Sequence, residues 1–413
     1  MKPHTWMWIP VVSLFAALTL AVLLVMTAVP ANAQRIGLSE RSGLPAWTGG
    51  NRMSPTSQTL AQTSSGNIET NNHNARYKVV PIGVLPGKTT TFLTTQRDVN
   101  NIGHVTGYSY VYTGDYHSLF LTGQGFIWQN GKLKALPLLS GWPGAFGFGM
   151  NDRDQVVGTA NNTDGSGNIL QTAVLWDHGQ PVNLGSLQPN SNAAALDVNI
   201  WGVIVGQSYS FDTQLELPVV WNKGSVQQLP LLPGETQGSA EEINVLGVIV
   251  GSQRSDTNQI PCLWYWNGMG YTAVNLGTLG GDDGQAFGID NLSRAVGYSS
   301  YPGDNQAPGF LWDYRHGLQV LSPLPGDDFA QGNNINDLGQ VVGLSIFATP
   351  ESFSQRAVIW QNATVADLQT LVPPGTPPLN YQVGNINDLG VIAVDATNPD
   401  GTSLGLLLVP TDK

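Results

Sequence analysis

One short motif occurs seven times along this chain, at intervals of 45 to 51 residues. Its clearest copies read "INDLGQVVG" from Ile335 and "INDLGVIAV" from Ile386. All seven copies carry a polar residue at the same position, which we call the anchor: Asn100, Asn151, Asn199, Asn244, Asp290, Asn336 and Asn387. Spacing that varies only between the copies is typical of a fixed structural unit joined by loops of different length.

Two further motifs follow each of the first six anchors. A tryptophan motif such as "FLWDYRHG" is centred on Trp128, Trp176, Trp221, Trp266, Trp312 and Trp360. A third motif such as "VNLGTL" comes next, so each unit contains four short apolar runs separated by turn residues. Within the anchor motif, the Asn bonds to nearby backbone and the Gly is free to take positive φ. Four antiparallel strands every ~45 residues predict a β-propeller blade, with a parallel β-solenoid of shorter coils as the alternative.

The two ends of the repeat region complement each other. The seventh unit supplies only three strands before the chain stops, whereas "VPIGVL" from Val80 matches "VNLGTL" from Val274 and precedes the first anchor. We therefore expect residues 78–85 to form the fourth strand of the last blade, which would remove the exposed sheet edges of an open array. The predicted fold is an all-β, seven-bladed propeller over residues 78–413.

The segments "NINDLGQVVGLS", "GFLWDYRHG" and "NLGTLGGDDGQAFGIDN" resemble the HAF repeats of secreted bacterial proteins. The resemblance covers about 78–413. Asp290 replaces the usual Asn, several units lack the Asp of the Asn-Asp pair, and the His that often opens the FLW strand is absent. The family implies a repeat fold and export, and it implies no catalytic residues.

The first 33 residues are typical of a secretory signal peptide. An apolar run extends from Ile9 to Val29, and Ala31 and Ala33 form a small-residue cleavage site before Gln34. An uncleaved membrane anchor is the alternative, because the run is long enough to span a bilayer. Residues 34–77 are rich in Ser, Thr, Asn and Gly, which predicts a flexible linker. We expect a secreted or periplasmic protein, cleaved after Ala33, with no membrane span in the mature chain.

Charge and cysteine content narrow the possible partners. The formal charge is −12, and the loss of Lys2 with the signal peptide makes it −13. An acidic chain repels nucleic acid, so DNA and RNA are not expected partners. We also expect the protein to be a monomer. Cys262 is the single cysteine, so no intramolecular disulfide forms, and its apolar surroundings predict a small buried side chain rather than a nucleophile.

No known catalytic arrangement is present. The sequence lacks a nucleophile elbow, a zinc-protease helix motif, a Walker loop and a Cys-x-x-Cys pair. The recurring Asn-Asp pair does not act as a general acid and base, because equivalent turns do not give two carboxyl groups different environments. We expect no catalytic residues, and we interpret the anchors as structural turn residues.

The variable loops are the predicted binding site. In a propeller, the loops between second and third strands lie on the same face as the loops that lead to the next blade. Function usually resides in such loops. The candidates for ligand binding are Tyr110, Tyr112, Tyr116, Trp142, Phe146, Asp282, Asp283, Tyr301, Asp327, Asp328, Phe329 and Tyr381. Aromatic rings beside carboxylates suit a sugar, and the same carboxylates suit Ca²⁺. The "NTDGSGN" segment at 162–168 resembles the start of a calcium loop, although Ala173 stands where a bidentate Glu belongs.

Three functions are consistent with these features. The first is a secreted, non-catalytic propeller that binds a glycan or an extracellular protein through one loop face. The second is a polysaccharide hydrolase or lyase that uses Asp282, Asp283, Asp327 or Asp328, since glycosidases need two carboxyl groups on either side of the bond. The third is a structural protein of the cell surface or matrix, tethered by its N-terminal segment. No cofactor is expected apart from Ca²⁺.

Overall fold

The computed structural model describes residues 75–93, 97–111, 113, 116–189, 191–303, 306–349, 352–379, 382–398 and 402–411. The predicted signal peptide and almost all of the predicted linker lie outside these residues. His73–Lys413 form one compact unit. No helix in the described part of the chain is both long and apolar enough to cross a membrane.

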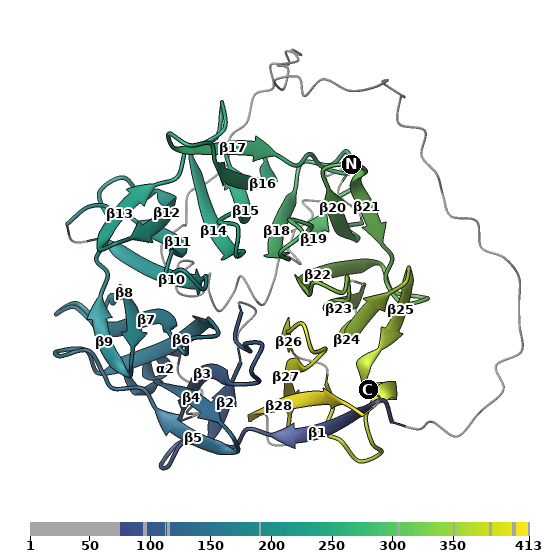
Figure 1. The fold of residues 1–413 in the computed structure, drawn as a ribbon, viewed down its shortest axis with the longest axis horizontal. Coiled ribbons are helices and arrows are strands. Elements are labelled where there is room, and N and C mark those ends of the chain that lie inside the picture. Colours follow the sequence, from purple (N-terminus) through teal and green to yellow (C-terminus); the bar gives the residue numbers. More distant parts are fainter. Residues whose placement is uncertain are drawn as a thin grey trace, which may run out of the picture. The chain divides into compact units, whose positions relative to one another are not determined.

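Seven four-stranded antiparallel sheets surround a central axis, which confirms the predicted propeller (Figure 1). The innermost strands are β2 (Thr90–Phe92), β6 (Gly144–Met150), β10 (Asn192–Val198), β14 (Gln237–Ile243), β18 (Gly284–Ile289), β22 (Phe329–Ile335) and β26 (Gln382–Ile386). The second strands are β3 (Val105–Tyr110), β7 (Val156–Thr163), β11 (Ile204–Tyr209), β15 (Ile249–Arg254), β19 (Ala295–Ser299), β23 (Val341–Ala348) and β27 (Ile392–Thr397).

The outer half of each blade is a hairpin, except in the last. The third strands are β4 (Gln124–Gln129), β8 (Ile169–Asp177), β12 (Glu216–Asn222), β16 (Gln259–Trp266), β20 (Gly309–Asp313), β24 (Phe353–Gln361) and β28 (Ser403–Pro410). The outermost strands are β5 (Lys132–Ala135), β9 (Gln180–Asn183), β13 (Ser225–Gln228), β17 (Tyr271–Asn275), β21 (Gly317–Leu321), β25 (Thr364–Asp367) and β1 (Tyr77–Pro81). Helix α2 (Tyr116–Thr122) lies between β3 and β4, and a 3₁₀ turn, η2 (Leu368–Leu371), follows β25.

The ring closes as the sequence predicts. β1 pairs antiparallel with β28, from Tyr77 opposite Pro410 to Pro81 opposite Leu406. The last blade therefore takes three strands from the C-terminal end of the chain and one from the N-terminal end. The strand begins one residue before the predicted segment and ends at Pro81, after which the Ile82 N–H still donates to the Gly405 carbonyl of β28 at 3.0 Å.

Apolar clusters fill the spaces between neighbouring blades. The two successive valines of the anchor motif pack in two different clusters, because successive strand residues point to opposite faces of the sheet. Val341 packs in a cluster with Val296 of the preceding blade, and Val342 packs with Ile386 of the following blade. Cys262 is fully buried in the cluster between blades three and four, and burial raises the pKa of its thiol well above the usual value. Its predicted role as a small buried side chain is confirmed.

The recurring tryptophans connect one blade to the next, and one of them is assigned differently from the prediction. Trp176, Trp221, Trp264 and Trp360 are buried, and their indole N–H groups donate to backbone carbonyls near the end of the preceding blade at 2.7–3.2 Å. Trp264 lies opposite Ile249, as Trp221 lies opposite Ile204. The equivalent residue in the fourth unit is therefore Trp264, and the assignment to Trp266 was wrong. Trp266 points to the same side two residues later, beyond the edge of the core.

Each anchor side chain holds its own turn, in agreement with the sequence interpretation. In the fourth blade, Asn244 Oδ1 accepts the backbone N–H groups of Leu246 at 3.0 Å and Val248 at 2.9 Å. The residue three positions after the anchor has positive φ in all seven turns. It is glycine in five of them, and Asp154 and Ser293 take the same left-handed conformation in the other two. We call these connections between first and second strands the inner turns.

Six of the seven anchors also hold the next blade, which the sequence did not reveal. The amide N–H of each asparagine anchor donates to the backbone carbonyl of the following anchor at 2.9–3.2 Å. These bonds, the anchor belt, run from Asn100 to Asn151, Asn151 to Asn199, Asn199 to Asn244, Asn244 to Asp290, Asn336 to Asn387, and Asn387 back to Asn100. The belt is closed across the junction between the two ends of the chain.

The link from the fifth blade to the sixth is made by a different side chain. Asp290 has no amide N–H to donate, so Arg294 Nη2 donates to the carbonyl of Asn336 at 3.4 Å. Arg294 Nε donates in turn to Asp290 Oδ2. The replacement of Asn by Asp at this anchor is therefore compensated four residues later, where the arginine supplies the missing donor.

This compensation can be transferred to the sixth blade. Asn336→Asp removes the belt donor to the Asn387 carbonyl, which still accepts the Gly390 N–H at 2.9 Å. We expect the variant to lower the free energy of unfolding in urea titrations by about 0.5–1.5 kcal/mol, the usual net contribution of one hydrogen bond. Asn336→Asp with Gln340→Arg recreates the Asp290–Arg294 pair and should recover most of that loss. A double variant no more stable than the single one would contradict this account of the belt.

Candidate functional site

The seven inner turns meet around the axis at one end of the propeller. The residue after each anchor faces the opening. The backbone N–H of Asn101 donates to Asp152 Oδ1 at 2.7 Å, and that of Asp337 donates to Asp388 Oδ1 at 2.9 Å. Asn291, Asp388 and Val245 donate to the next turn in the same way. This second set of bonds is missing where Ile200 and Val245 offer no side-chain acceptor, so the Asp and Asn side chains at this position connect the turns.

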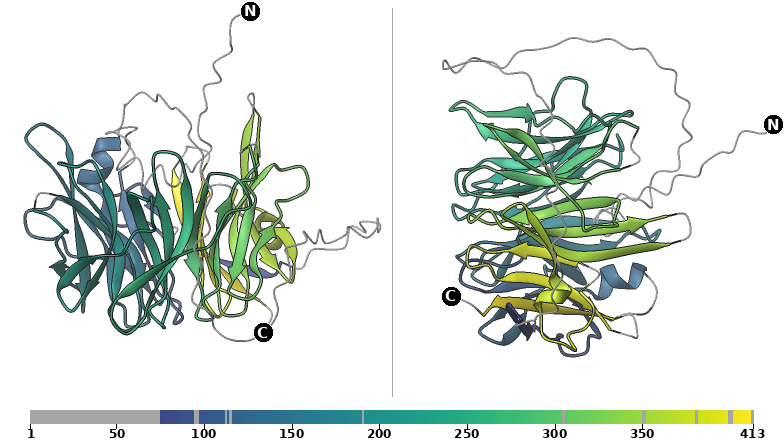
Figure 2. Two further views of the ribbon diagram at one scale, coloured as in Figure 1. Left: turned by 90° about the horizontal axis from the view of Figure 1, so that it is seen from above. Right: turned by 90° about the vertical axis from the view of Figure 1, so that its right-hand side faces the viewer.

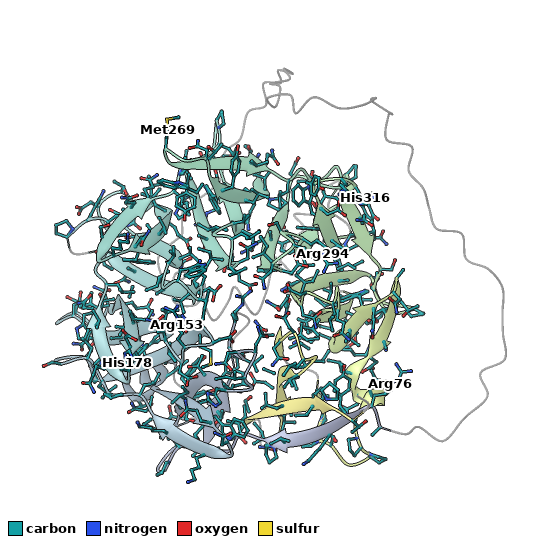
Figure 3. All side chains as sticks on the ribbon, viewed as in Figure 1. Arg76, Arg153, His178, Met269, Arg294 and His316 are labelled. Atoms are coloured by element: carbon teal, nitrogen blue, oxygen red, sulfur yellow. The ribbon has the colours of Figure 1, made fainter. Side chains whose placement is uncertain are left out.

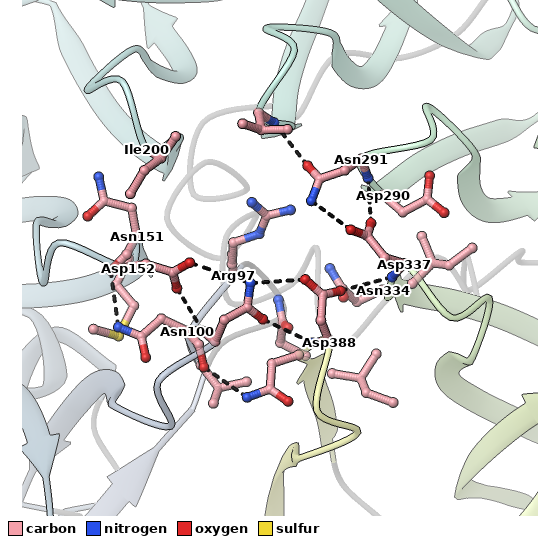
Figure 4. Close-up of a pocket in the computed structure, with 18 residues that line it drawn as sticks. Arg97, Asn100, Asn151, Asp152, Ile200, Asp290, Asn291, Asn334, Asp337 and Asp388 are labelled. Carbon is pink, nitrogen blue, oxygen red and sulfur yellow. Dashed lines mark hydrogen bonds between the residues drawn. The ribbon is translucent and has the colours of Figure 1, made fainter.

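These turns line a cavity of about 240 Å³ at the end of the axis (Figure 4). Its wall combines the anchors Asn100, Asn151, Asp290 and Asn387 with the residues that follow them. Asp152, Asp337 and Asp388 make the wall acidic. The cavity is thus built from the repeated motif itself and lies on the face opposite the variable loops.

One cation, Arg97, projects into this cavity from the segment between β2 and β3 (Figure 4). It crosses from the first blade to the fourth, where Nη2 lies 2.8 Å from Glu242 Oε1. Burial alone would lower the pKa of Arg97, but the nearby charges of Glu242, Asp197 and Asp388 raise it above its ordinary value. The guanidinium is therefore charged at every pH at which the protein folds.

Two buried carboxyl groups share this one arginine. Glu242 Oε2 accepts the Ile289 N–H at 3.0 Å and the Asn334 side-chain amide at 2.9 Å, in addition to the ion pair. Asp197 Oδ2 accepts the Ile243 N–H at 2.9 Å, whereas Oδ1 is buried with no partner among the described residues. Burial raises the pKa of both groups, and the charge of Arg97 opposes that rise. The ion pair and two further donors of Glu242 favour its ionised form, so we predict that a proton kept by this pair resides on Asp197.

Arg97, Asp197 and Glu242 were not predicted from the sequence, although the sequence contains a signal for the two acidic residues. Asp197 and Glu242 each stand two residues before an anchor, at the end of a strand whose other residues are largely apolar or small. A charged residue in a buried innermost strand must be paired, because an isolated charge there is very costly. Arg97 gave no such signal, since only the closed ring brings it beside the fourth blade.

A second feature of the inner turns is a ring of exposed apolar side chains, two positions after each anchor. We call it the apolar collar: Ile102, Trp201, Leu246, Leu292, Leu338 and Leu389, with exposed fractions of 56–71%. In the second blade the position is held by Arg153, which lies toward the axis (Figure 3). The Trp201 indole N–H donates to the Val245 carbonyl of the next turn at 3.0 Å. Neighbouring turns are joined by the belt, so the collar surrounds the acidic cavity.

The variable loops lie at the other end of the blades, because the four strands of each sheet alternate in direction. Tyr112 and Tyr381 fall outside the described residues. Tyr116 begins helix α2, and its side chain also lies outside the description. Among the remaining predicted residues, those in connections between second and third strands or between blades, as expected, are Trp142, Asp282, Asp283, Tyr301, Asp327 and Asp328. The loop prediction was wrong for Phe146, which lies within the innermost strand β6, while Tyr110 ends β3 and Phe329 begins β22.

The aromatic group lies between the first two blades. Phe146 is buried and stacks on Tyr108 with ring centroids 4.2 Å apart, and Tyr110 lies 6.0 Å from the same ring. Trp142 is half-buried and packs on the cluster around Trp176. Phe146 therefore serves the packing of this region, while Tyr110 and Trp142 keep part of their surface exposed.

The acidic groups lie in the fifth and sixth blades. Asp283 accepts the Tyr298 hydroxyl at 3.2 Å. Asp327 pairs with Arg356 at 2.6 Å and accepts the Ser345 hydroxyl. Asp282 is exposed, whereas Asp328, Phe329 and Tyr301 are half-buried. Both Asp283 and Asp327 have structural partners, and a role for any of these residues in ligand binding or hydrolysis stays a prediction.

In the segment that resembles a calcium loop, the Asp164 carboxylate is hydrogen-bonded to groups of the same segment. Asp164 Oδ1 accepts the backbone N–H groups of Ser166 and Asn168, and Oδ2 accepts the Asn168 side-chain amide at 2.7 Å. These bonds lower the pKa of Asp164. Within the described ranges, no three His, Cys, Asp or Glu side chains lie close enough together to hold a metal ion.

Comparison with known proteins finds similar solved structures at low sequence identity. No protein-family model matches the sequence, and no curated protein is similar to it. Similar solved structures include TolB from Acinetobacter baumannii, at 13% identity and a TM-score of 0.39, over 75% of this chain and 80% of that one. The β-propeller domain of the Trilobed protease from Pyrococcus furiosus is 8% identical, with a TM-score of 0.42, over 78% and 94% of the two chains. A gluconolactonase from Xanthomonas campestris is 12% identical, with a TM-score of 0.36, over 82% and 93%.

The proton on Asp197 predicts how stability depends on pH. A folded-state pKa above the unfolded value means that the folded protein binds more protons between the two values, so stability falls as pH rises through that range. Asn is an isostere of protonated Asp. We therefore expect Asp197→Asn to change the free energy of unfolding little at pH 4 and to raise it at pH 8, by about 1.4 kcal/mol for each unit of pKa elevation, as measured by urea titration at the two pH values.

Asp152→Asn is the matched control, because that carboxylate is exposed and accepts a backbone N–H. It should show no gain at pH 8. If Asp197→Asn instead destabilises the protein equally at both pH values, then Asp197 is ionised and the assignment of the proton is wrong.

Proposed function

We propose that this propeller is a non-catalytic binding module that holds a protein partner on its inner-turn face. The observation that carries the proposal is the apolar collar, six large exposed side chains at one equivalent position around an acidic cavity. Burying a Leu side chain stabilises a complex by about 1.5–3 kcal/mol at most, so the collar leaves a large amount of favourable burial unused in the free protein. Large apolar side chains that gather on one exposed face are a feature of interaction sites.

The charge of this face indicates the chemistry of the partner. Asp152, Asp337 and Asp388 lie inside the collar, and the whole chain is acidic. A partner that presents a basic group surrounded by apolar side chains would complement both the cavity and the collar. Such complementarity raises association rates and selects against acidic partners.

The arrangement favours binding over catalysis. The carboxylates nearest the cavity accept backbone N–H groups of neighbouring turns, which commits them to structure. We also propose, from the sequence alone, that the chain is exported and cleaved after Ala33, where it meets extracellular or periplasmic partners. The polysaccharide hydrolase or lyase suggested by the loop carboxylates is the alternative.

The proposal is tested by site-specific photo-crosslinking in cells that produce the protein. A photoreactive residue at position 338 should capture a defined partner, and the same residue at position 320 should not. Val320 is an exposed apolar residue in the outermost strand β21, which makes it a matched control. The purified partner should bind Leu246→Asp with Leu338→Asp at least tenfold more weakly than the parent, because charged side chains would have to be desolvated.

Val320→Asp should leave that affinity unchanged. Equal capture from positions 338 and 320, or full affinity in the collar double variant, would show that the inner-turn face is not the docking surface.

A further inference from the structure

The outer hairpin of the fourth blade differs from the five other hairpins between third and outermost strands. Those five end one pair beyond the core tryptophan, as at Asn222 opposite Ser225 in the third blade. In the fourth blade the ladder continues by one more pair, Trp266 opposite Tyr271. Asn267 then closes a longer turn by accepting the backbone N–H groups of Met269 and Gly270.

The additional pair places two aromatic rings at the perimeter. The rings of Trp266 and Tyr271 are 5.4 Å apart at 78°, so they form two walls of a corner. Trp266 is 55% exposed, and Met269 at the tip of the turn points away from the ring of blades (Figure 3). At the position of Trp266 the neighbouring hairpins carry Lys223 and Tyr314. The exposed tryptophan is thus specific to one blade and is not required by the repeat.

A groove of about 470 Å³ separates this aromatic corner from the third blade. Its opposite wall carries Asn222, Lys223, Ser225 and Gln227, from the outer hairpin β12–β13. The volume lies within the range of small-ligand sites, about 300–1,000 Å³. The Ser225 hydroxyl donates to the Asn222 carbonyl, and the side-chain amides of Asn222 and Gln227 make no hydrogen bond within the described residues. The groove therefore has one aromatic wall and one wall with free amide donors and acceptors.

We propose that this groove binds a pyranose ring of a β-1,4-linked glucan. The face of an aromatic ring is electronegative and attracts C–H bonds that carry partial positive charge. A β-glucopyranose has all its substituents equatorial, so its flat faces present axial C–H bonds to Trp266. Its equatorial hydroxyls then extend toward the amides of Asn222 and Gln227, which both donate and accept. This site is separate from the inner-turn face and does not depend on the function proposed for it.

The test is calorimetric titration of the full chain with cellohexaose. The parent protein should bind, Trp266→Ala should weaken binding at least tenfold, and Gln227→Ala should weaken it several-fold. Tyr314→Ala is the matched control, because Tyr314 is an exposed aromatic residue in the corresponding hairpin of the next blade. It should bind cellohexaose as the parent does. Melting curves check that Trp266→Ala folds, as expected for a residue outside the core.

Absence of binding by the parent protein overturns the proposal. Equal losses in Trp266→Ala and Tyr314→Ala also overturn it, because the binding would then be non-specific contact with exposed aromatic rings. If Gln227→Ala binds cellohexaose as tightly as the parent, the Gln227 amide does not contact the sugar, which contradicts the proposed orientation of the sugar.

Discussion

The bond on which this architecture depends is the amide N–H of one anchor donating to the backbone carbonyl of the next. Each anchor is nearly fully buried, and its carbonyl accepts two hydrogen bonds, one from the preceding blade and one from the backbone N–H three residues later in its own turn. The same side chain fixes its own turn through its oxygen. One residue therefore sets both the shape of the turn and its distance from the neighbouring turn, and this double demand explains why the motif is repeated. Asp290 is tolerated only because Arg294 supplies the missing donor.

The belt also determines what faces the axis. Because all seven turns have the same conformation, residues at equivalent positions form rings at successive distances from the core. Asp197 and Glu242 lie inside the ring, and each stands two positions before an anchor. The residues directly after the anchors line the cavity. The residues two positions after the anchors form the apolar collar. A motif that is architectural at its anchor therefore produces a recognition surface at its variable positions. The ring also places two buried carboxyl groups beside the single charge of Arg97, and burial raises the pKa of both.

The sequence predicted the blade number, the strand order and the closing strand, because these follow from apolar periodicity and turn residues within each repeat. It assigned Trp266 in place of Trp264, since both residues alternate to the same side of one strand and only the register with β15 separates them. It did not predict the belt or the position of Arg97, because both require the seventh blade to meet the first. The differing lengths of the variable loops led to the prediction of a binding site in those loops. The collar was not predicted, because leucine in a tight turn has no periodic signal.

The central claim is that the closed belt couples all seven blades into one cooperative unit, including the blade built from both chain ends. Native-state hydrogen exchange, followed by mass spectrometry across a series of urea concentrations, tests it directly. The account predicts that strand amides of β27 and β28 open with the same free energy and urea dependence as those of β15 and β16. Opening of the seventh blade at a free energy about 2 kcal/mol or more below that of the fourth would show that it unfolds on its own and would contradict the claim.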